Sequence, residues 1–282
     1  MLEKYLTQYE YVPIEIIERE AKLPPPQLSM SLSKLSRLKI IKRRLGSLTG
    51  YRLTYLGYDC LAIRSLVERG VLAALGDRMG VGKESDVYVG LTPAEEKVIV
   101  KFLRIGRTSF RQTKRVRDYT RDKPEYGWLL QSKVAAEKEF KALDLLWKAS
   151  AKVPRPIGRS RHVVVTSYIE GVELYRYKDP MDPEYMLKVI LETLRKAYLE
   201  VGIVHGDLSE YNVLVAINPD KGVEEPYIID WPQYVYREDP QSEYLLRRDV
   251  EYIIRFFNRK YKLKNIDAER ALLYVRGEID EI

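Results

Sequence analysis

Residues 205–212 read His-Gly-Asp-Leu-Ser-Glu-Tyr-Asn, which has the form H-x-D-x-x-x-x-N. Apolar residues at helical spacing precede this stretch, and an apolar, strand-like run follows it. A second apolar run further along the chain ends directly before Asp230. The sequence therefore predicts a helix, a polar loop and two strands, and it singles out three polar side chains: Asp207, Asn212 and Asp230.

The chemistry that suits these side chains is phosphoryl transfer. Asp207 can orient a hydroxyl group or a water molecule and accept its proton, while Asn212 and Asp230 can hold magnesium against phosphates. Magnesium prefers hard oxygen ligands and keeps several waters, so two side chains are enough. The pattern alone is weak, because common polar residues match it by chance. A polar turn between a helix and a strand is the alternative, so other parts of a nucleotide site must decide.

The chain has 282 residues, enough for one large domain or two ordinary ones. Of these residues 45% are hydrophobic, which is enough to form a core. It has no apolar run of about 18 residues and begins without the apolar core of a signal peptide, so we expect a cytoplasmic protein without a membrane span. The single cysteine, Cys60, fits a reducing compartment, and its apolar helix predicts a buried structural thiol. The net charge of +7 favours an anionic partner, either nucleic acid or phosphates.

The first part of the chain has a winged-helix pattern. A short helix with Pro13 in its first turn precedes four leucines at helical spacing between residues 28 and 38. Residues 40–44 and 51–53 then predict a β-hairpin, and Thr54 is suited to cap the helix that follows. A helix pair followed by a hairpin is typical of winged-helix domains.

The winged helix is also basic. Residues 21–58 contain no Asp or Glu but eight basic residues, which are Lys22, Lys34, Arg37, Lys39, Lys42, Arg43, Arg44 and Arg52. An uncompensated basic face on a helix and wing suits a phosphate backbone. A solvated face, or a wing that docks on protein, is the alternative. Nothing indicates base-specific readout, and structured RNA is recognised mainly through shape and phosphates.

A glycine-containing hairpin is expected after a polar turn at residues 76–78. Two glycines two positions apart precede an alternating strand, and backbone amides in such a turn can cover phosphates. The Walker pattern is absent, and an ordinary hairpin is the alternative. The residues expected to contact the nucleotide here are Gly80, Gly82, Lys83, Glu84, Ser85 and Val87.

The strand at residues 97–102 carries Lys101 after an apolar run, which matches the kinase strand whose lysine neutralises nucleotide phosphates. An amphipathic helix beginning near residue 135 then supplies a glutamate to pair with Lys101. We choose Glu139 over Glu137, because Glu139 adjoins a predicted core-facing Phe140.

Residues 162–171 predict a strand that runs into a linker ending in glycine. In a two-lobed kinase such a strand ends at the hinge, where backbone groups of Ser167 and Ile169 would meet the adenine edge, with Thr166 behind it. We expect His162 to lie at the surface. Residues 104–123 are dense in charge and predict a loop that grips RNA or substrate phosphates, or is solvated and disordered in isolation.

With these parts in order, the chain resembles the RIO family of atypical protein kinases over nearly its whole length. The winged helix, residues 80–88 and the sequence Ile-Asp-Trp-Pro-Gln at residues 229–233 are similar to the second RIO subfamily. The sequence shows no long C-terminal extension, from which we expect a prokaryotic, archaeal source. The resemblance implies an α+β protein with a winged helix followed by a truncated two-lobed kinase domain. The expected boundaries are 1–75 for the winged helix, 76–166 for the N-lobe, 167–171 for the hinge and 172–282 for the C-lobe, with residues 76–282 forming the RIO domain.

The resemblance further implies an ATP-dependent serine/threonine kinase or ATPase that uses magnesium, or manganese in its place. It implies a role in maturation of the small ribosomal subunit, with the pre-ribosomal particle and its rRNA contacted through the winged helix and residues 104–123. The protein substrate stays open, and autophosphorylation is possible. The alternative class is a non-catalytic RNA-binding scaffold with a kinase-like fold.

Several positions depart from ordinary kinases. Ser85 replaces the third glycine of the loop, Gly206 the catalytic-loop arginine, and Trp231 the phenylalanine of the D-F-G motif. Only 52 residues (282 − 230) follow Asp230, and no A-P-E sequence occurs among them, so a peptide-binding platform is doubtful. Asp249 is either an anchor for the catalytic loop or an ordinary surface residue. Two mechanisms therefore stay open, a kinase with Asp207 as base and an ATPase in which a carboxylate itself takes the phosphoryl group.

Overall fold

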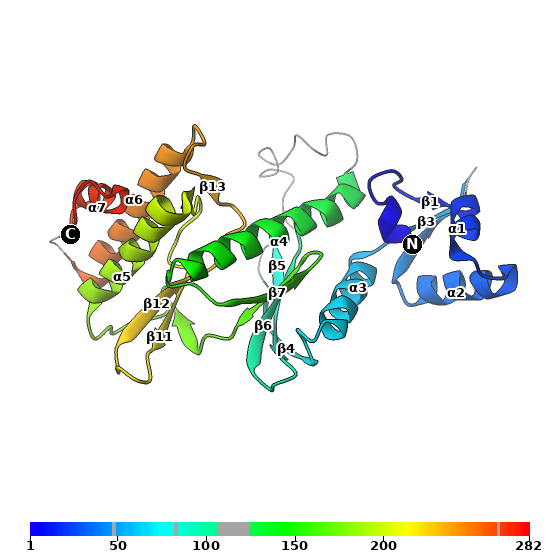
Figure 1. Cartoon of the computed structure of the whole chain (residues 1–282), viewed down its shortest axis with the longest axis horizontal. Helices are drawn as coiled ribbons and strands as arrows, with labels where there is room; N and C mark the ends of the chain where they lie inside the picture. The colour runs from blue at the N-terminus through cyan, green and yellow to red at the C-terminus, as the bar shows by residue number, and fades with distance from the viewer. Residues whose placement is uncertain (47–48, 82–83, 107–123, 264–265) are drawn as a thin grey trace. The chain divides into compact units, whose positions relative to one another are not determined.

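The computed structural model describes residues 1–46, 49–81, 84–106, 124–263 and 266–282. The chain folds into two compact units, which are described separately. The first comprises Met1–Ala136 with Gly158–Val165, and the second comprises Glu137–Ile157 with Thr166–Ile282. Helices and strands mix in the described parts, which confirms the α+β class (Figure 1). Within them, no helix is long and apolar enough to cross a membrane.

The winged helix opens the first unit. Its three-stranded sheet has the order β1-β3-β2, and Thr54 Oγ1 caps helix α3 by accepting from the backbone N–H of Gly57 at 3.1 Å. The predicted helix pair, hairpin and cap are thus confirmed. The elements are η1 (Leu2–Tyr5), β1 (Val12–Pro13), α1 (Ile14–Ala21), α2 (Pro25–Arg37), β2 (Ile41–Arg44), β3 (Gly50–Leu53) and α3 (Tyr55–Glu68).

Helix α3 contradicts the prediction for Cys60, whose side chain is exposed. Tyr58, Ala62 and Leu66 are buried at spacings of four residues, so they form the inner face of the helix. Cys60 lies half a turn from Tyr58 and faces outward. The apolar composition of this helix suggested burial on every side, whereas only one stripe is packed.

A five-stranded sheet follows, with the strand order β4-β5-β6-β8-β7. The expected turn at residues 76–78 was wrong, because these residues lie inside β4, where the pairing register shifts between Leu75 and Arg78. Such a bulge accommodates polar residues without ending the strand. The strands are β4 (Ala74–Val81), β5 (Ser85–Leu91), β6 (Lys97–Leu103), β7 (Pro156–Ser160) and β8 (Val163–Ser167).

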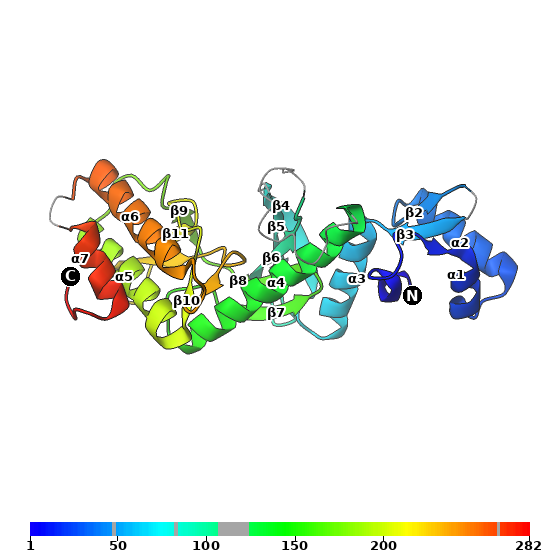
Figure 2. The same cartoon turned by 90° about the horizontal axis from the view of Figure 1, so that it is seen from above.

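The second unit is built on helices α5, α6 and α7, which lie side by side (Figures 1 and 2). Their apolar faces and the end of α4 bury Leu146, Ile190, Val250 and Phe257 completely. Its elements are the end of α4 (Pro124–Lys148), β9 (Gly171–Glu173), α5 (Pro183–Lys196), the π-helical turn Ala197–Val201, β10 (Ile203–Val204), β11 (Val213–Ile217), β12 (Glu224–Ile228), β13 (Val235–Tyr236), α6 (Ser242–Tyr261) and α7 (Ala268–Arg276).

The strands of the second unit place the predicted loop residues. Strands β11 and β12 form the expected hairpin, and β10 pairs with β13 directly before residue 205. Residues 168–170 connect β8 to β9, where the hinge was expected. The domain, lobe and hinge boundaries themselves stay predictions.

Candidate active site

The loop at residues 205–212 is held by one buried carboxylate. Asp249, on helix α6, is 1% exposed and accepts two backbone hydrogen bonds, from Gly206 N–H at 2.7 Å and from Leu208 N–H at 3.1 Å. These two donors flank Asp207 in the chain, so the backbone of Asp207 is fixed from both sides. Asp249 is therefore the anchor of the loop and not a surface residue.

Gly206 is required by the backbone of this loop. Its φ angle is +78°, in the left-handed region, and a Cβ atom here would lie 3.1 Å from the carbonyl oxygen of Gln233.

Burial raises the pKa of the Asp249 carboxyl, while His205 and the two backbone donors act in the opposite direction. The two N–H groups thus oppose the cost of burying this carboxylate.

His205 links the loop at residues 205–212 to the chain before Asp230. The imidazole is fully buried, with Nε2 3.1 Å from the carbonyl oxygen of Ile229, and Nδ1 accepts from the backbone N–H of Asp207 at 3.3 Å. This pattern assigns the ring proton to Nε2. The ring also lies 4.6 Å from the fully buried Trp231. The first residue of the motif, His205, therefore has a structural role.

Asn212 and Asp230 are brought together by the β11–β12 hairpin. Val213 pairs with Ile228, and the N–H of Ile229 donates to the carbonyl oxygen of Asn212 at 2.8 Å, so Asn212 lies across from the residue before Asp230. Ser209 Oγ donates to Asn212 Oδ1 at 2.7 Å and orients the amide. This leaves one lone pair on Asn212 Oδ1, and with the exposed Asp230 carboxylate it forms a set of hard oxygen donors that fits magnesium.

Asp207 presents its carboxylate to solvent. Its side chain is 72% exposed, and Nη2 of the Arg248 guanidinium lies 3.9 Å from Asp207 Oδ1. Arg248 also donates to the carbonyl oxygen of Gly206. The backbone of Asp207 is thus held in place while its carboxylate is accessible. A general base needs both properties, because its carboxylate must contact an incoming hydroxyl.

The segment after Asp230 is tied to helix α4. Lys138 Nζ donates to the carbonyl oxygen of Tyr234 at 3.0 Å, and Lys141 Nζ donates to the hydroxyl of Tyr236 at 2.8 Å. Burial lowers the pKa of Lys138, and the Lys141 ammonium lowers the pKa of Tyr236. On the same helix Glu139 is 3% exposed, whereas Glu137 is only half-buried. No pattern in the sequence indicated the two lysine contacts.

The first unit places the other expected nucleotide residues on its sheet. Gly80 pairs with Val87, and Val87 pairs with Lys101, so the three lie in one row across β4, β5 and β6. Paired residues of antiparallel strands share a face, and Lys101 is half-buried on it. Gly82 and Lys83 lie outside the described residues. Lys101 and Glu139 belong to different units, so their pairing stays a prediction.

The expected adenine contacts also stay predictions. The backbone N–H of Ser167 donates to the carbonyl oxygen of Arg155 at 2.8 Å, and Ser167 Oγ accepts from Arg155 N–H at 3.0 Å. The backbone group that Ser167 can offer to a base is therefore its carbonyl oxygen. Thr166 is buried behind it, and Ile169 is half-buried.

Two expectations about charged residues were wrong. His162 is fully buried instead of lying at the surface, and Arg104, placed in the charged loop, is 7% exposed. Both side chains bind Asp59 of helix α3, which explains their burial. Their partners lie 45 and 103 residues away in the chain, so no local pattern could have revealed the pairing. Residues 107–123, the rest of the expected loop, lie outside the described residues.

Replacing Asp249 by asparagine is expected to lower single-turnover ATP consumption by at least ~10-fold and the free energy of unfolding by about 1–3 kcal/mol. Asparagine has nearly the same shape, but its single oxygen can accept only one of the two N–H groups, and its amide opposes the other. Urea unfolding and a rapid-quench assay measure the two effects. Glu251→Gln, on the same helix, is the matched control and should change neither. Wild-type turnover in Asp249→Asn would contradict the anchoring role.

Comparison with known proteins identifies relatives along the whole chain. A model of the RIO domain matches residues 86–271, and a model of the Rio2 N-terminal domain matches residues 1–69. The chain is 37% identical to the RIO-type serine/threonine-protein kinase Rio2 of Methanocaldococcus jannaschii, over 96% of this chain and 99% of that protein. It is 35% identical to the serine/threonine-protein kinase rio2 of Schizosaccharomyces pombe, over 91% of this chain and 73% of that protein. The crystal structure of a Rio2 kinase–ADP/Mg2+–phosphoaspartate complex from Chaetomium thermophilum is similar with a TM-score of 0.83 and 32% identity, over 98% of this chain and 84% of that chain.

Proposed function

The chain belongs to the RIO family of atypical serine/threonine kinases, with the N-terminal domain of the Rio2 branch, and on that premise we propose how its residues divide the work of ATP-dependent phosphoryl transfer. The observation that carries the proposal is the anchored loop that exposes Asp207 and continues to Asn212, whose carbonyl oxygen accepts from the N–H of Ile229, directly before Asp230. ATP is the phosphoryl donor. Lys101 binds its phosphates, and Asn212 and Asp230 hold magnesium, or manganese in its place.

In the kinase mechanism Asp207 orients a seryl or threonyl hydroxyl and accepts its proton as the oxygen attacks the γ-phosphorus. The bond to the bridging oxygen breaks, and ADP leaves with that oxygen. Bound magnesium supplies charge neutralisation on the phosphates. The fixed backbone of Asp207 limits the carboxylate to side-chain rotations, which keeps it within reach of one acceptor position. Arg248 offers a positive charge beside the carboxylate.

In the ATPase mechanism a carboxylate oxygen of Asp207 or Asp230 attacks the γ-phosphorus and ADP leaves. Water then hydrolyses the aspartyl phosphate and regenerates the carboxylate, releasing inorganic phosphate. The phosphoaspartate named in the Chaetomium thermophilum complex supports this route.

A single-turnover assay with γ-labelled ATP and magnesium tests the proposal on the wild-type protein. Released phosphate, phosphoserine and base-labile protein label are followed in the same reaction. Phosphoserine supports the kinase mechanism, and base-labile label that precedes phosphate release supports the aspartyl-phosphate ATPase. Bound ATP without any turnover would favour the alternative, a non-catalytic RNA-binding scaffold.

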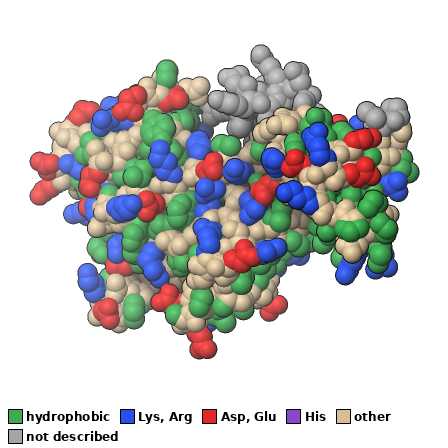
Figure 3. Space-filling view, turned by 45° about the vertical axis from the view of Figure 1, so that its right-hand side comes forward, with side chains coloured by type: hydrophobic (Ala, Val, Ile, Leu, Met, Phe, Trp, Pro, Cys, Tyr) green, Lys and Arg blue, Asp and Glu red, His purple; other side chains and the backbone are tan. Residues whose placement is uncertain are grey.

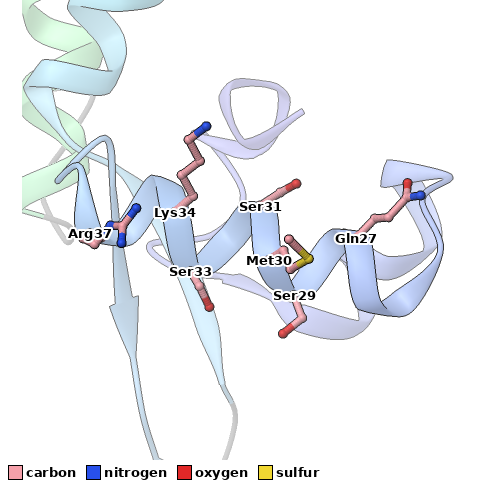
Figure 4. A pocket seen from close by; sticks show the side chains of 7 residues that line it. All are labelled: Gln27, Ser29, Met30, Ser31, Ser33, Lys34 and Arg37. Atoms are coloured by element: carbon pink, nitrogen blue, oxygen red, sulfur yellow. The ribbon is translucent and has the colours of Figure 1, made fainter.

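We also propose that the winged helix binds rRNA of the small-subunit precursor. Lys34 and Arg37 are exposed on α2, and Lys42 and Arg43 are exposed on β2. The outer side of α2 borders a shallow depression of about 690 Å³ lined by Gln27, Ser29, Met30, Ser31, Ser33, Lys34 and Arg37 (Figure 4). Hydroxyl, amide and cationic groups of this kind suit phosphate oxygens.

The basic surface is more limited than the acid-free stretch of sequence suggested. Glu10, which precedes that stretch, lies 3.7 Å from Arg44 and 3.8 Å from Arg52, so two of the eight basic residues have a carboxylate beside them. Over most of the face drawn in Figure 3, basic and acidic side chains are interspersed. Lys34 and Arg37 are therefore the first candidates for phosphate contacts.

The double substitution Lys34→Ala/Arg37→Ala is expected to flatten the salt dependence of RNA binding. Removing one cation that neutralises a phosphate should reduce the slope of log K against log salt by about 0.7 for single-stranded RNA. Affinity is measured by fluorescence anisotropy with a small-subunit rRNA fragment between about 50 and 300 mM salt. Arg64→Gln, which breaks an exposed ion pair with Glu68 on α3, is the control and should keep the wild-type slope. An unchanged slope in the double variant would remove α2 from the interface.

We further propose a cytoplasmic location. The single, exposed Cys60 supports it, because a chain without a possible internal disulfide suits a reducing compartment.

A further inference from the structure

A buried cluster of charges joins helix α3 of the winged helix to strands β5 and β6. Arg104 directly follows β6, and its guanidinium binds the carboxylate of Asp59 through two hydrogen bonds, Nη1 to Oδ1 at 2.6 Å and Nη2 to Oδ2 at 2.8 Å. Its Nε donates to Asp86 Oδ2 on β5 at 3.0 Å. The planar, forked guanidinium suits this bridge, because it presents donors to two carboxylates at once.

The backbone of Arg104 holds the same hairpin. Its N–H donates to the carbonyl oxygen of Glu84 at 2.6 Å, while its side chain binds Asp86. Glu84 and Asp86 flank Ser85, one of the residues expected to contact phosphates. Asp86 pairs with Phe102 and Val87 pairs with Lys101, so Asp86 lies on the sheet face opposite to Lys101. Arg104 thus braces the phosphate-binding hairpin from its reverse side.

His162 and two tyrosines complete the cluster. His162 Nε2 lies 2.7 Å from Asp59 Oδ1, and its ring stacks on Tyr58 with centroids 4.8 Å apart. Burial lowers the pKa of His162, so the neutral ring donates to the carboxylate. The Tyr55 hydroxyl donates to the carbonyl oxygen of Ile105 at 2.9 Å, next to Arg104. Helix α3 therefore supplies a carboxylate, a stacking ring and a hydroxyl to the end of β6.

Stability alone does not require this network. Well-packed apolar residues stabilise a buried junction as well as or better than ions do, whereas a buried ionic cluster fixes one geometry through directional bonds. The geometry fixed here is that of the hairpin arm at residues 84–86 relative to helix α3. We propose that Arg104, held by Asp59, is a positioning residue for the phosphate-binding hairpin, so that the winged helix forms part of the support of the nucleotide site. This inference rests on the proposed binding of ATP phosphates by the hairpin.

The test compares two ligands that differ in their phosphates. Asp59→Asn is expected to raise the Kd of magnesium ATP about tenfold and to leave the Kd of adenosine within about twofold of wild type. Adenosine lacks phosphates, so a hairpin displaced from its supported position affects ATP alone. Calorimetry on the full chain measures both constants, and the α3 variant Glu68→Gln, which removes an exposed ion pair, should match wild type for both.

The outcomes separate this inference from the proposed function. If wild-type protein binds no ATP, the proposed function fails; if it binds ATP and Asp59→Asn binds it equally well, the positioning role fails. An equal loss for ATP and adenosine marks a general structural defect and also contradicts the role. Should Asp59→Asn not fold, Arg104→Lys serves instead, because it keeps the charge and loses the fork that spans Asp59 and Asp86. It should show the same selective loss.

Discussion

Alanine at position 207 is expected to reduce single-turnover ATP consumption by a factor of about 10²–10⁴, the usual contribution of a positioned general base, and to leave the affinity for ATP unchanged. Asp207 is 72% exposed, and the bonds from Gly206 and Leu208 to Asp249 do not involve its side chain. The loop should therefore keep its conformation when the carboxylate is removed. A loss of rate without a loss of binding would locate the defect in the chemical step.

Rapid-quench kinetics with γ-labelled ATP measures the rate, and calorimetry measures the affinity. Asp220→Ala, in the exposed loop between β11 and β12, is the control and should retain wild-type rate and affinity. Turnover of Asp207→Ala within about threefold of wild type would rule out Asp207 as the catalytic carboxylate. Weaker ATP binding with a normal rate would instead show that the Asp207 carboxylate contributes to binding of ATP and not to the chemical step.

Elements with strong periodicity could be predicted from the sequence. The leucines of α2 form a helix where expected, and the hairpin that follows Asn212 and precedes Asp230 agrees with the two apolar runs. The anchor role of Asp249 was one of two alternatives, and its burial decided between them. The helices and the hairpin depend on the spacing of neighbouring residues, which a sequence displays directly, whereas the partners of Asp249 lie 41 and 43 residues away.

Features that depend on distant partners could not be predicted. The sequence around Arg104 predicted a charged loop, and His162 was expected at the surface. Both side chains are buried because they bind Asp59. Glu224, which follows a turn-rich stretch of sequence, is 2% exposed because its carboxylate accepts from the Tyr177 hydroxyl and from the N–H of Met181. A polar residue reveals its burial only through its partners, and local patterns do not contain them.

Backbone detail was also beyond the sequence. Residues 76–78 suggested a turn, whereas they lie within β4, where the pairing register with β5 shifts and the strand continues to Val81. Cys60 was assigned by the composition of its helix, although one helical face is packed and the other is exposed. Pairing between Lys101 and Glu139 stays a prediction. It calls for a charge-reversal pair, because only the combined reversal would restore an ion pair.

Asp230→Asn is expected to abolish the effect of magnesium on ATP binding and to lower turnover by at least ~100-fold. Asp230 has a φ angle of +69°, in the left-handed region, and asparagine adopts that region more readily than most residues. The variant should therefore fold like wild type while lacking a charged oxygen for the metal. ATP titrations with and without magnesium measure the effect, and wild-type protein in EDTA should reproduce the variant. Magnesium-dependent binding that persists in Asp230→Asn would remove Asp230 from the metal site.

The same variant locates the phosphoryl group if an aspartyl phosphate forms. Borohydride reduces an acyl phosphate to an alcohol, so mass spectrometry of the reduced, labelled wild-type protein distinguishes residue 207 from residue 230. If Asp230 is the acceptor, Asp230→Asn forms no base-labile label, whereas Asp207→Ala accumulates it when Asp207 assists hydrolysis. If Asp207 is the acceptor, its alanine variant carries no label at any time. Under the kinase mechanism neither aspartate is reduced, because the label resides on serine or threonine. The geometry supports either carboxylate, since Asp207 is exposed beside Arg248 and Asp230 is exposed one residue after Ile229, which is bonded to Asn212.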